Sequence, residues 1–416
     1  MNKILVMACN AWNFDEIGGA YKIATDLAIF CGQNGWDVHY VCGGKSNRCY
    51  EPQLEQGVQV WRYPRPSGSG QTKSPAHLWQ HLKGCQNITR RILSTLDRNK
   101  TIVLNGHTHL QYCASLNVLR AFSRCYKVMS VHSPLTDEYK AEKNFHLSLG
   151  NKLITSVLSC IEAACYRQSR LIQCDSKFTS SLLAKEFKRE THGKLVVCPG
   201  YVDLEKFSVD SLTRMEARQK LSAKAWDSRD LCFFSLRRHV ERMGVDTLIK
   251  ALAWLRSQTA LSVSRKFRLI IGGEGPLTGK LKDLASSLDL DQHIYFVGNI
   301  PEAEVALSYR ASDCFILPTR SMECFGLVVL ESFAAGTPVI ATPVGAIPEL
   351  LGPFKRQFLT EGVEPEALGK AMLNFLISEQ DKGMEQELRQ YASQFNRQVI
   401  LKKLENLIGQ TDGNNP

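Results

Sequence analysis

The sequence predicts an α/β protein with two domains, each built on a parallel β-sheet. The chain has 416 residues, and two domains are the natural expectation at roughly 100–200 residues per domain. Short, almost continuous runs of Val, Ile and Leu recur along the chain, as in strands that are buried on both faces of a parallel sheet. Helical stretches alternate with these runs, which is typical of βαβ units. A content of 44% hydrophobic and 22% charged residues fits an ordinary globular protein rather than a disordered one.

The first half of the chain, residues 1–200, is predicted to form an N-terminal Rossmann-like domain. Its opening segment is too short and too quickly polar for a secretory signal, and it has the pattern of a first buried strand. Residues 64–74, rich in Pro, Gly and Ser, are expected to form a flexible surface loop. The strands expected in this half are Lys3–Cys9, Asp37–Val41, Val58–Tyr63, Thr101–Leu104, Lys127–Val131, Leu171–Cys174 and Leu195–Cys198.

The pattern of strands and helices restarts after the Pro- and Gly-containing segment Pro199–Asp203. We therefore expect a second Rossmann-like domain over residues 201–385, with a hinge near residues 200–203. Residues 386–416 are expected to form C-terminal helices that pack back towards the N-terminal domain, with a frayed end from Thr411. The strands expected in the second half are Leu231–Leu236, Phe267–Ile271, Ile294–Val297, Cys314–Leu317 and Pro338–Ala341.

Charge and cysteine content limit the partners. The net charge of +10 suits an anionic partner such as a sugar nucleotide, an acidic lipid surface or a nucleic acid. The basic residues are not concentrated in one stripe and no nucleic-acid-binding signature is present, so no nucleic acid is expected. The 14 cysteines are scattered and form no C-x-x-C pair, which argues against zinc and favours buried thiols in a reduced, cytoplasmic protein. The sequence contains no apolar run of about 18 residues, so no membrane-spanning helix is expected.

The strongest signal for function lies in residues 317–350. The strand Cys314–Leu317 leads through a polar loop to a helix that starts near Phe325 and Gly326 and stops at Gly336, a typical C′ position. Free N–H groups and the helix dipole at this start, around Leu327, favour a phosphate. Glu331 on the helix is placed to bind ribose hydroxyls, and Glu323 in the loop to bind sugar hydroxyls. One ligand with a sugar, a diphosphate and a ribose accounts for these features.

This segment resembles the retaining glycosyltransferases of family 4, whose signature is E-x7-E within the GT-B fold. Glu323, Phe325, Gly326 and Glu331 match that signature, and the segment from Ala334 to Glu349 matches its continuation. The resemblance covers roughly residues 1–380 and implies two Rossmann-like domains that face each other across a cleft. It also implies transfer of a hexose-type sugar from a nucleoside diphosphate sugar to a hydroxyl, with retention of configuration. UDP-sugars are favoured as donors and GDP-mannose comes next.

A basic turn follows the strand Leu231–Leu236 and carries the second signal. Arginine binds a diphosphate with a planar fork of donors. The resemblance implies an Arg after the strand and a Lys just before a Gly as the pyrophosphate clamp. Arg238 matches the Arg position, whereas Met243 occupies the Lys position, so the second role is carried over to Arg242.

Further matches are made by glycines and loop residues. Gly273 and Gly275 lie in a glycine-rich turn after a strand, where a phosphate or ribose approaches the backbone closely. Gly18 and Gly19 open a helix after the first strand without forming G-x-G-x-x-G, which counts against dinucleotide binding. The resemblance implies that these glycines lie near the diphosphate and the acceptor. It further implies that the segment containing Asn299 and Ile300 holds the base through its backbone.

Histidines mark two strand ends in the first half. His132 follows the strand Lys127–Val131, and the resemblance implies that it contacts the donor sugar. Asn105, His107 and His109 end the preceding strand and are expected to line the acceptor side. No carboxylate completes a metal site with His107 and His109, so neither a metal nor another cofactor is expected.

These features together predict a metal-free catalytic site with Glu323, His132, Arg238 and Arg242 as its principal side chains. The basic groups and the helix start stabilise the leaving diphosphate. The acceptor is expected to be a glycan, a lipid-linked molecule or a small molecule, and the sequence does not distinguish among them. A role in polysaccharide biosynthesis is expected. Alternatives are a nucleotide-sugar 2-epimerase of the same architecture, a phosphorylase-like enzyme with pyridoxal phosphate, and a non-catalytic scaffold.

A peripheral contact with the inner face of a membrane is a further open question. The predicted helix Leu78–Leu96 carries Trp79, Leu82, Ile88 and Leu93 beside Lys83, Arg90 and Arg91. Such a helix either lies on an anionic surface or packs on the sheet like an ordinary helix, and the second interpretation is favoured.

Overall fold

The computed structural model describes residues 3–15, 18–44, 50–64, 75–97, 100–120, 122, 124–142, 149–209, 211–221, 225–226, 230–259, 266–378 and 383–410. The expected loop at residues 65–74 and the expected frayed end at 411–416 lie outside these residues. The chain divides into two compact units: unit 1 comprises Met1–Tyr139, His146–Gly200 and Gln398–Pro416, and unit 2 comprises Lys140–Phe145 and Tyr201–Arg397. Residues 386–397, expected among helices that return to the N-terminal domain, thus belong to unit 2.

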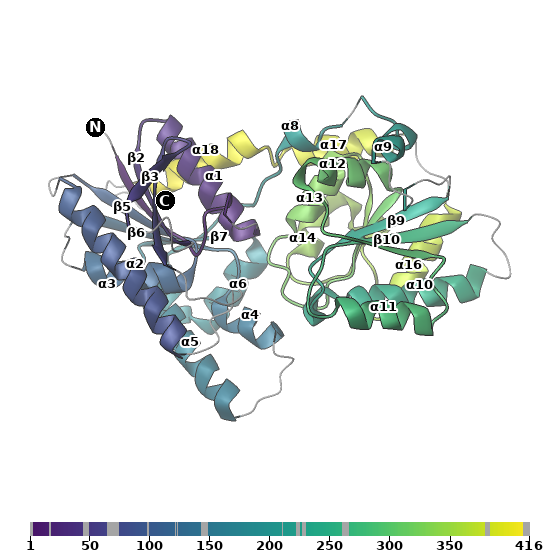
Figure 1. Cartoon of the computed structure of the whole chain (residues 1–416), viewed down its shortest axis with the longest axis horizontal. Helices are drawn as coiled ribbons and strands as arrows, with labels where there is room; N and C mark the ends of the chain where they lie inside the picture. The colour runs from purple at the N-terminus through teal and green to yellow at the C-terminus, as the bar shows by residue number, and fades with distance from the viewer. Residues whose placement is uncertain are drawn as a thin grey trace. The chain divides into compact units, whose positions relative to one another are not determined.

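Unit 1 contains an eight-stranded sheet in the order β3-β4-β2-β1-β5-β6-β7-β8 (Figure 1). All neighbouring strands are parallel except β3, which pairs antiparallel with β4. This short edge strand was not expected, because its side chains alternate between exposed and half-buried and form no apolar run. The strands are β1 (Ile4–Ala8), β2 (Asp37–Gly44), β3 (Pro52–Glu55), β4 (Val58–Pro64), β5 (Ile102–Gly106), β6 (Cys125–Val131), β7 (Leu171–Cys174) and β8 (Leu195–Val197).

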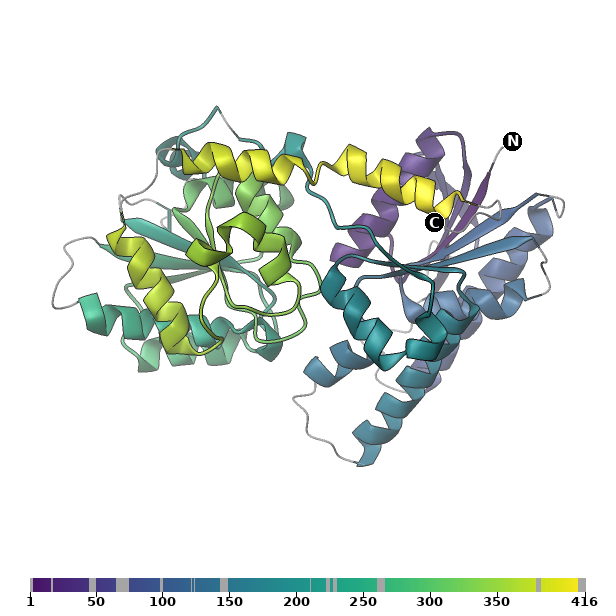
Figure 2. The same cartoon turned by 180° about the vertical axis from the view of Figure 1, so that it is seen from behind.

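Helices cover both faces of this sheet. The helices of unit 1 are α1 (Gly19–Gln33), α2 (Pro75–Thr95), α3 (His109–Leu119), α4 (Leu135–Glu142), α5 (Leu149–Gln168), α6 (Lys177–Glu186), α7 (Lys188–Thr191) and α18 (Arg397–Ile408). Val6 and Ala8 of β1 pack into a core with α2, α3 and α5. Figures 1 and 2 show α1, in purple, and α18, in yellow, on the opposite face.

Helix α2 packs on the sheet of unit 1 with its apolar side. Ile88 and Leu93 are fully or almost fully buried in the core of unit 1, so the apolar side of α2 packs on the sheet. Trp79 is 59% exposed, and the Lys83 ammonium lies 4.5 Å from the centroid of its ring. The favoured interpretation of an ordinary packed helix therefore agrees with the structure. Among the described residues, no helix is long and apolar enough to cross a membrane.

Unit 2 contains a five-stranded, fully parallel sheet in the order β11-β10-β9-β12-β13. Its strands are β9 (Leu231–Leu236), β10 (Phe267–Gly272), β11 (Ile294–Gly298), β12 (Cys314–Leu317) and β13 (Val339–Ala341). Its helices are α8 (Leu204–Phe207), α9 (Arg214–Leu221), η2 (Glu241–Met243), α10 (Val245–Thr259), α11 (Thr278–Ser287), α12 (Glu302–Ala311), α13 (Leu327–Ala334), α14 (Ile347–Leu351), η3 (Gly352–Phe354), α15 (Lys355–Phe358), α16 (Pro365–Ile377) and α17 (Met384–Ser393).

Both faces of the unit 2 sheet are buried, which explains its continuous apolar strands. Phe234 and Phe315 face a core shared with α12, α13 and α17. Phe233 and Leu269, which point the other way, face α10, α11 and α16. The two helical layers lie on opposite sides of the sheet in Figure 2.

Each sheet has one place where the strand order reverses. In unit 1 the reversal lies between β1 and β5, and in unit 2 it lies between β9 and β12. Ligands of open α/β sheets bind beyond the carboxyl ends of the strands at such a switch point. A ligand site in unit 2 is therefore expected at the loops that follow β9 and β12.

Candidate functional site

An arginine–glutamate pair occupies the switch point of unit 2. The Nη2 of Arg237, directly after β9, donates a hydrogen bond of 2.6 Å to the Oε2 of Glu323, in the loop after β12. The same Nη2 lies 3.2 Å from the Oγ1 of Thr319. The two charged side chains are only 8% and 14% exposed. Such a sheltered pair presents a fixed charge arrangement rather than a loose surface contact.

The buried Nε of Arg237 has no hydrogen-bond partner among the described residues. A buried, unsatisfied donor is costly unless something else binds it. In this case the donor belongs to a guanidinium at the sheet's switch point. The arrangement therefore suits an anionic ligand that completes the hydrogen bonding of Arg237.

Glycines bring the loops of this site into backbone contact. Gly273 has φ +98°, and a Cβ there would lie 2.1 Å from the carbonyl oxygen of Arg237. Gly345 has φ +62°, and a Cβ there would lie 2.1 Å from the carbonyl oxygen of Glu323. Both positions combine the left-handed backbone with a space that no side chain fits. Gly273 therefore fixes the loop that carries Arg237, and Gly275 approaches the carbonyl of His239 in the same way.

Helix α13 begins next to this pair, as the sequence indicated. Gly326 is its N-cap, with φ +93°, and Leu327 is its first residue. The side chain of Phe325 is buried in the core of unit 2, so only its backbone is available for contact with a ligand. Gly336 follows the helix with φ +74°, as expected of a C′ glycine.

Glu331 lies on α13 and is oriented by a buried tyrosine. The hydroxyl of Tyr309 donates a hydrogen bond of 3.1 Å to the Oε2 of Glu331. Burial, followed by the nearby Glu331 carboxylate, raises the pKa of Tyr309 well above its ordinary value. Tyr309 therefore remains a neutral donor that fixes the rotamer of Glu331. Sequence reasoning did not identify this role, because Tyr309 lies on a different helix, α12.

The two arginines assigned from the sequence have different surroundings. Arg238 is exposed, and its neighbour Arg237 makes the hydrogen bond to Glu323. The Nη1 of Arg242 donates a hydrogen bond of 3.2 Å to the carbonyl of Met322, one residue before Glu323. Met243 also contacts Arg237, with 2.7 Å between Sδ and Nη2.

Asn299 and Ile300 lie in the adjoining loop after β11. The Nδ2 of Asn299 donates to the Oε2 of Glu274 over 2.9 Å, and the amide of Gly273 donates to the carbonyl of Gly298 over 2.7 Å. Ile300 is half-buried against Gly272. The loops after β9, β10 and β11 thus form one packed surface at the carboxyl edge of the sheet.

A second cluster lies at the corresponding edge of unit 1. The Nδ1 of His132, directly after β6, is hydrogen-bonded to the Oδ2 of Asp175 over 2.7 Å. Its Nε2 is hydrogen-bonded to the Nδ1 of His107 over 2.8 Å. The Nε2 of His107 in turn contacts the Oδ1 of Asn105 over 2.8 Å. His109 is not part of this series of hydrogen bonds, and its Nε2 is hydrogen-bonded to the hydroxyl of Tyr166 over 2.8 Å. The sequence did not indicate Asp175.

Gly18 and Gly19 form the start of helix α1 in unit 1. Gly18 is the N-cap with an extended backbone, and a Cβ there would lie 2.9 Å from the ring of Tyr21. Tyr21 accepts a hydrogen bond of 2.9 Å from Asn10, which lies just beyond β1 at the switch point. The two glycines thus lie close to the switch point of unit 1.

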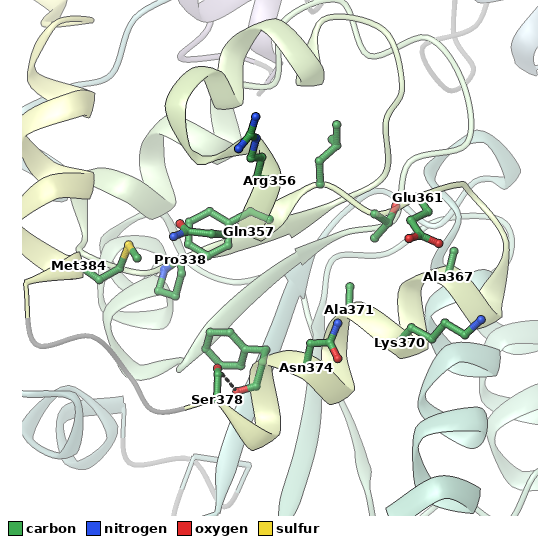
Figure 3. A pocket seen from close by; sticks show the side chains of 14 residues that line it. Pro338, Arg356, Gln357, Glu361, Ala367, Lys370, Ala371, Asn374, Ser378 and Met384 are labelled. Carbon is green, nitrogen blue, oxygen red and sulfur yellow. Dashed lines mark hydrogen bonds between the residues drawn. The ribbon is translucent and has the colours of Figure 1, made fainter.

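Metal-ligating side chains and cavities also bear on the candidate site. Within the described part of the chain, no group of three or more His, Cys, Asp or Glu side chains is arranged to hold a metal ion. A cavity of about 630 Å³ lies beside β13, between α15 and α16, with Arg356 and Asn374 in its lining (Figure 3). No residue assigned to the site from the sequence lines this cavity.

The halves of the chain match two family models. Residues 17–206 match "Glycosyltransferase Family 4", and residues 217–398 match "Glycosyl transferases group 1". Mannosylfructose-phosphate synthase of Agrobacterium fabrum is 23% identical over 382 residues, which are 86% of this chain and 78% of that protein. A GDP-mannose-dependent alpha-(1-6)-phosphatidylinositol monomannoside mannosyltransferase of Mycobacterium tuberculosis is 29% identical over 49% of this chain. The chain matches about half of that enzyme's length, 51%.

Solved structures give the same picture of the fold. Sucrose-phosphate synthase from Thermosynechococcus elongatus has a TM-score of 0.78 at 18% identity, over 99% of both chains. Anabaena Alr3699/HepE in complex with UDP-glucose has a TM-score of 0.70 at 17% identity, over 98% of this chain and 100% of that one. The protein therefore has the two-domain α/β fold of the GT-B enzymes. Its two halves match glycosyltransferase models in turn, and the chain is a GT-B glycosyltransferase.

Proposed function

We propose that this glycosyltransferase transfers a hexose from a nucleoside diphosphate sugar to an acceptor hydroxyl, with retention of configuration and without a metal ion. The observation that carries the proposal is the sheltered Arg237–Glu323 pair beside the start of α13 at the switch point of unit 2. A guanidinium, a carboxylate and free helix N–H groups in one place match a ligand that carries both phosphates and sugar hydroxyls.

Each group then has a role that follows from its chemistry. Arg237 and the amides at the start of α13 bind the diphosphate, and Arg242 adds a second positive charge nearby. Glu323 accepts hydrogen bonds from the transferred sugar, and Glu331, held by Tyr309, accepts them from the ribose. In unit 1, His132 contacts the substrate, as the sequence resemblance implies.

The proposed reaction breaks the bond between the anomeric carbon and the diphosphate oxygen. The acceptor oxygen forms a bond to the same face of that carbon, and its proton passes to the leaving diphosphate. Negative charge grows on the diphosphate during this step, and Arg237 stabilises it without reorganisation because its position is already fixed. Fixed cationic groups and a helix dipole thereby take the part of a metal ion.

Similar proteins support a nucleotide sugar as donor. One relative's name specifies GDP-mannose, and the solved Anabaena protein holds UDP-glucose. We propose a UDP-sugar as the first candidate and GDP-mannose as the second. The relatives include enzymes named for a sugar phosphate, for inositol 3-phosphate and for a phosphatidylinositol monomannoside, so the acceptor is proposed only as a hydroxyl compound of one of these classes.

Proton NMR of the product tests the proposed reaction. The purified chain is incubated with the donor that binds it and with an acceptor panel, in buffer containing EDTA. An α-linked product from an α-linked donor is expected. A product of inverted configuration contradicts retention, and transfer that depends on added magnesium or manganese contradicts the metal-free mechanism. Turnover of donor to an epimer without any acceptor would favour the epimerase alternative.

A further inference from the structure

The hydrogen-bond chain around His132 determines where its protons lie. Four side chains at the carboxyl ends of β5, β6 and β7 are joined in the order Asn105, His107, His132 and Asp175, with three contacts of 2.8, 2.8 and 2.7 Å. These hydrogen-bonded side chains are sheltered from solvent. His107 is 4% exposed, and the side chains of His132 and Asp175 are 10% and 7% exposed. Water therefore contributes little to these contacts, and each one needs a donor on one side and an acceptor on the other.

The orientation of Asn105 fixes one end of the chain. Its Nδ2 lies 3.4 Å from the carbonyl oxygen of Val128 and 3.1 Å from the Oγ of Ser130. A backbone carbonyl only accepts hydrogen bonds, so the amide nitrogen faces it and the Oδ1 faces His107. The Nε2 of His107 must consequently carry a hydrogen.

The carboxylate of Asp175 fixes the other end. Its Oδ1 accepts a hydrogen bond of 3.0 Å from the amide of Gln173, and its Oδ2 contacts the Nδ1 of His132. An ionised carboxylate only accepts, so the Nδ1 of His132 carries a hydrogen. One more hydrogen lies between the two imidazoles, on the contact that joins Nδ1 of His107 to Nε2 of His132.

Three ring hydrogens on two imidazoles amount to one positive charge. Burial, followed by the nearby His132, lowers the pKa of His107 well below its ordinary value. The charge therefore belongs on His132, next to the Asp175 carboxylate. Among the described residues, further titratable groups near these side chains include His109 and Glu162, whose Nε2 and Oε1 lie 3.6 Å apart. Another is Cys198, whose thiol pKa is raised by burial and by the Asp175 carboxylate.

We propose that Asn105, His107 and Asp175 are positioning residues that hold His132 as an imidazolium with both of its ring hydrogens engaged. His132 then acts on a ligand through its positive charge and its fixed ring, and a ring nitrogen becomes available to a sugar hydroxyl only when His107 gives up its contact. The contact of His132 with substrate rests on the proposed function, whereas the protonation state of the pair does not.

Nitrogen-15 NMR of the ligand-free full chain, labelled at histidine, tests this protonation state. The two residues are assigned with His107→Gln and His132→Gln, and exposed His192→Gln serves as the control that leaves both signals in place. At pH 7.5 we expect both ring nitrogens of His132 and only Nε2 of His107 to carry hydrogens. A wild-type spectrum with one protonated nitrogen on His132 overturns the proposal, and this spectrum decides the matter even where a variant fails to fold.

Asp175→Asn tests the positioning role in the same spectrum. Removal of the counter-charge is expected to leave His132 with a single ring hydrogen, and unchanged double protonation contradicts the role of Asp175. In turnover with saturating acceptor, we expect kcat/KM for the donor to fall about 10- to 100-fold, the range for a lost hydrogen bond to a charged group. Unchanged kcat/KM in a folded Asp175→Asn chain also overturns the role. The spectrum contains no nucleotide sugar, so failure of the proposed function leaves its outcome intact.

Discussion

Replacement of Arg237 by alanine, compared with the same change at Arg238, separates the two adjacent arginines of unit 2. Arg237→Ala removes the 2.6 Å hydrogen bond to Glu323 and the guanidinium proposed to bind the diphosphate. Loss of one fixed group that stabilises transition-state charge typically lowers kcat by about 10²–10³-fold. Arg238 is exposed and does not form the pair with Glu323, so we expect its replacement to lower kcat much less than Arg237→Ala does.

The stability of Arg237→Ala follows from the same contact. Glu323 is 14% exposed and would lose a charged hydrogen-bond partner. We expect the free energy of unfolding to fall by about 1–3 kcal/mol, the penalty for leaving a partly buried polar group without its partner. Arg238→Ala should leave the free energy of unfolding almost unchanged.

Steady-state release of nucleoside diphosphate, measured for both variants with the same donor and acceptor, provides the assay. Circular dichroism melts exclude loss of folding as the cause of lost activity. Diphosphate binding by Arg237 is contradicted when Arg237→Ala retains kcat within about threefold of wild type while Arg238→Ala loses it. That outcome would mean that Arg238 binds the diphosphate, as the sequence resemblance implies.

Three further predictions concern groups that the structure places by specific contacts. Tyr309→Phe removes the 3.1 Å hydrogen bond to Glu331, so donor KM should rise several-fold, and the free energy of unfolding should fall by about 1 kcal/mol. An unchanged KM in initial-rate measurements would contradict the positioning role of Tyr309. Glu405→Gln weakens the 2.9 Å bond from the Trp36 indole, which attaches α18 to unit 1; urea unfolding should show a loss of about 1–2 kcal/mol, and no loss would contradict an anchoring role. The pKa of His107 is lowered by burial, so the unfolded chain binds a proton near pH 6 that the folded chain does not. Stability should therefore fall as pH decreases below about 6.5, and equal urea midpoints at pH 5.5 and 6.5 would contradict this sign.

Much of the fold could be predicted from the sequence because buried parallel strands have a strong local pattern. The expected bounds of β7, β9 and β12 agree with the structure residue for residue. Strand β3 could not be found in this way, because it is a polar edge strand that is defined by its pairing with β4. Edge strands of this kind carry little apolar periodicity, so only the tertiary pairing reveals them.

The candidate site was predictable where its residues follow one strand directly, and less so where contacts cross between strands. Glu323, Gly326 and Glu331 lie on one continuous segment, and the structure places all three around the start of α13. The choice between Arg237 and Arg238 depends on which side chain faces β12, and a sequence does not state that direction. Asp175 lies 43 positions from His132, so their contact appears only once β6 and β7 are paired.

Metal-independent binding of a nucleotide sugar at Arg237 is tested most directly by the thermal stability of the chain. The stability is measured with UDP, GDP, ADP and their sugars, each with magnesium and with EDTA. A ligand at 100 times its Kd that binds only the folded protein adds about 2.7 kcal/mol of stability, enough to raise Tm by several degrees. We predict a shift with one of these nucleotides that is the same in magnesium and EDTA and is lost in Arg237→Ala. The absence of a shift with every nucleotide, or a full shift in Arg237→Ala, would contradict this prediction.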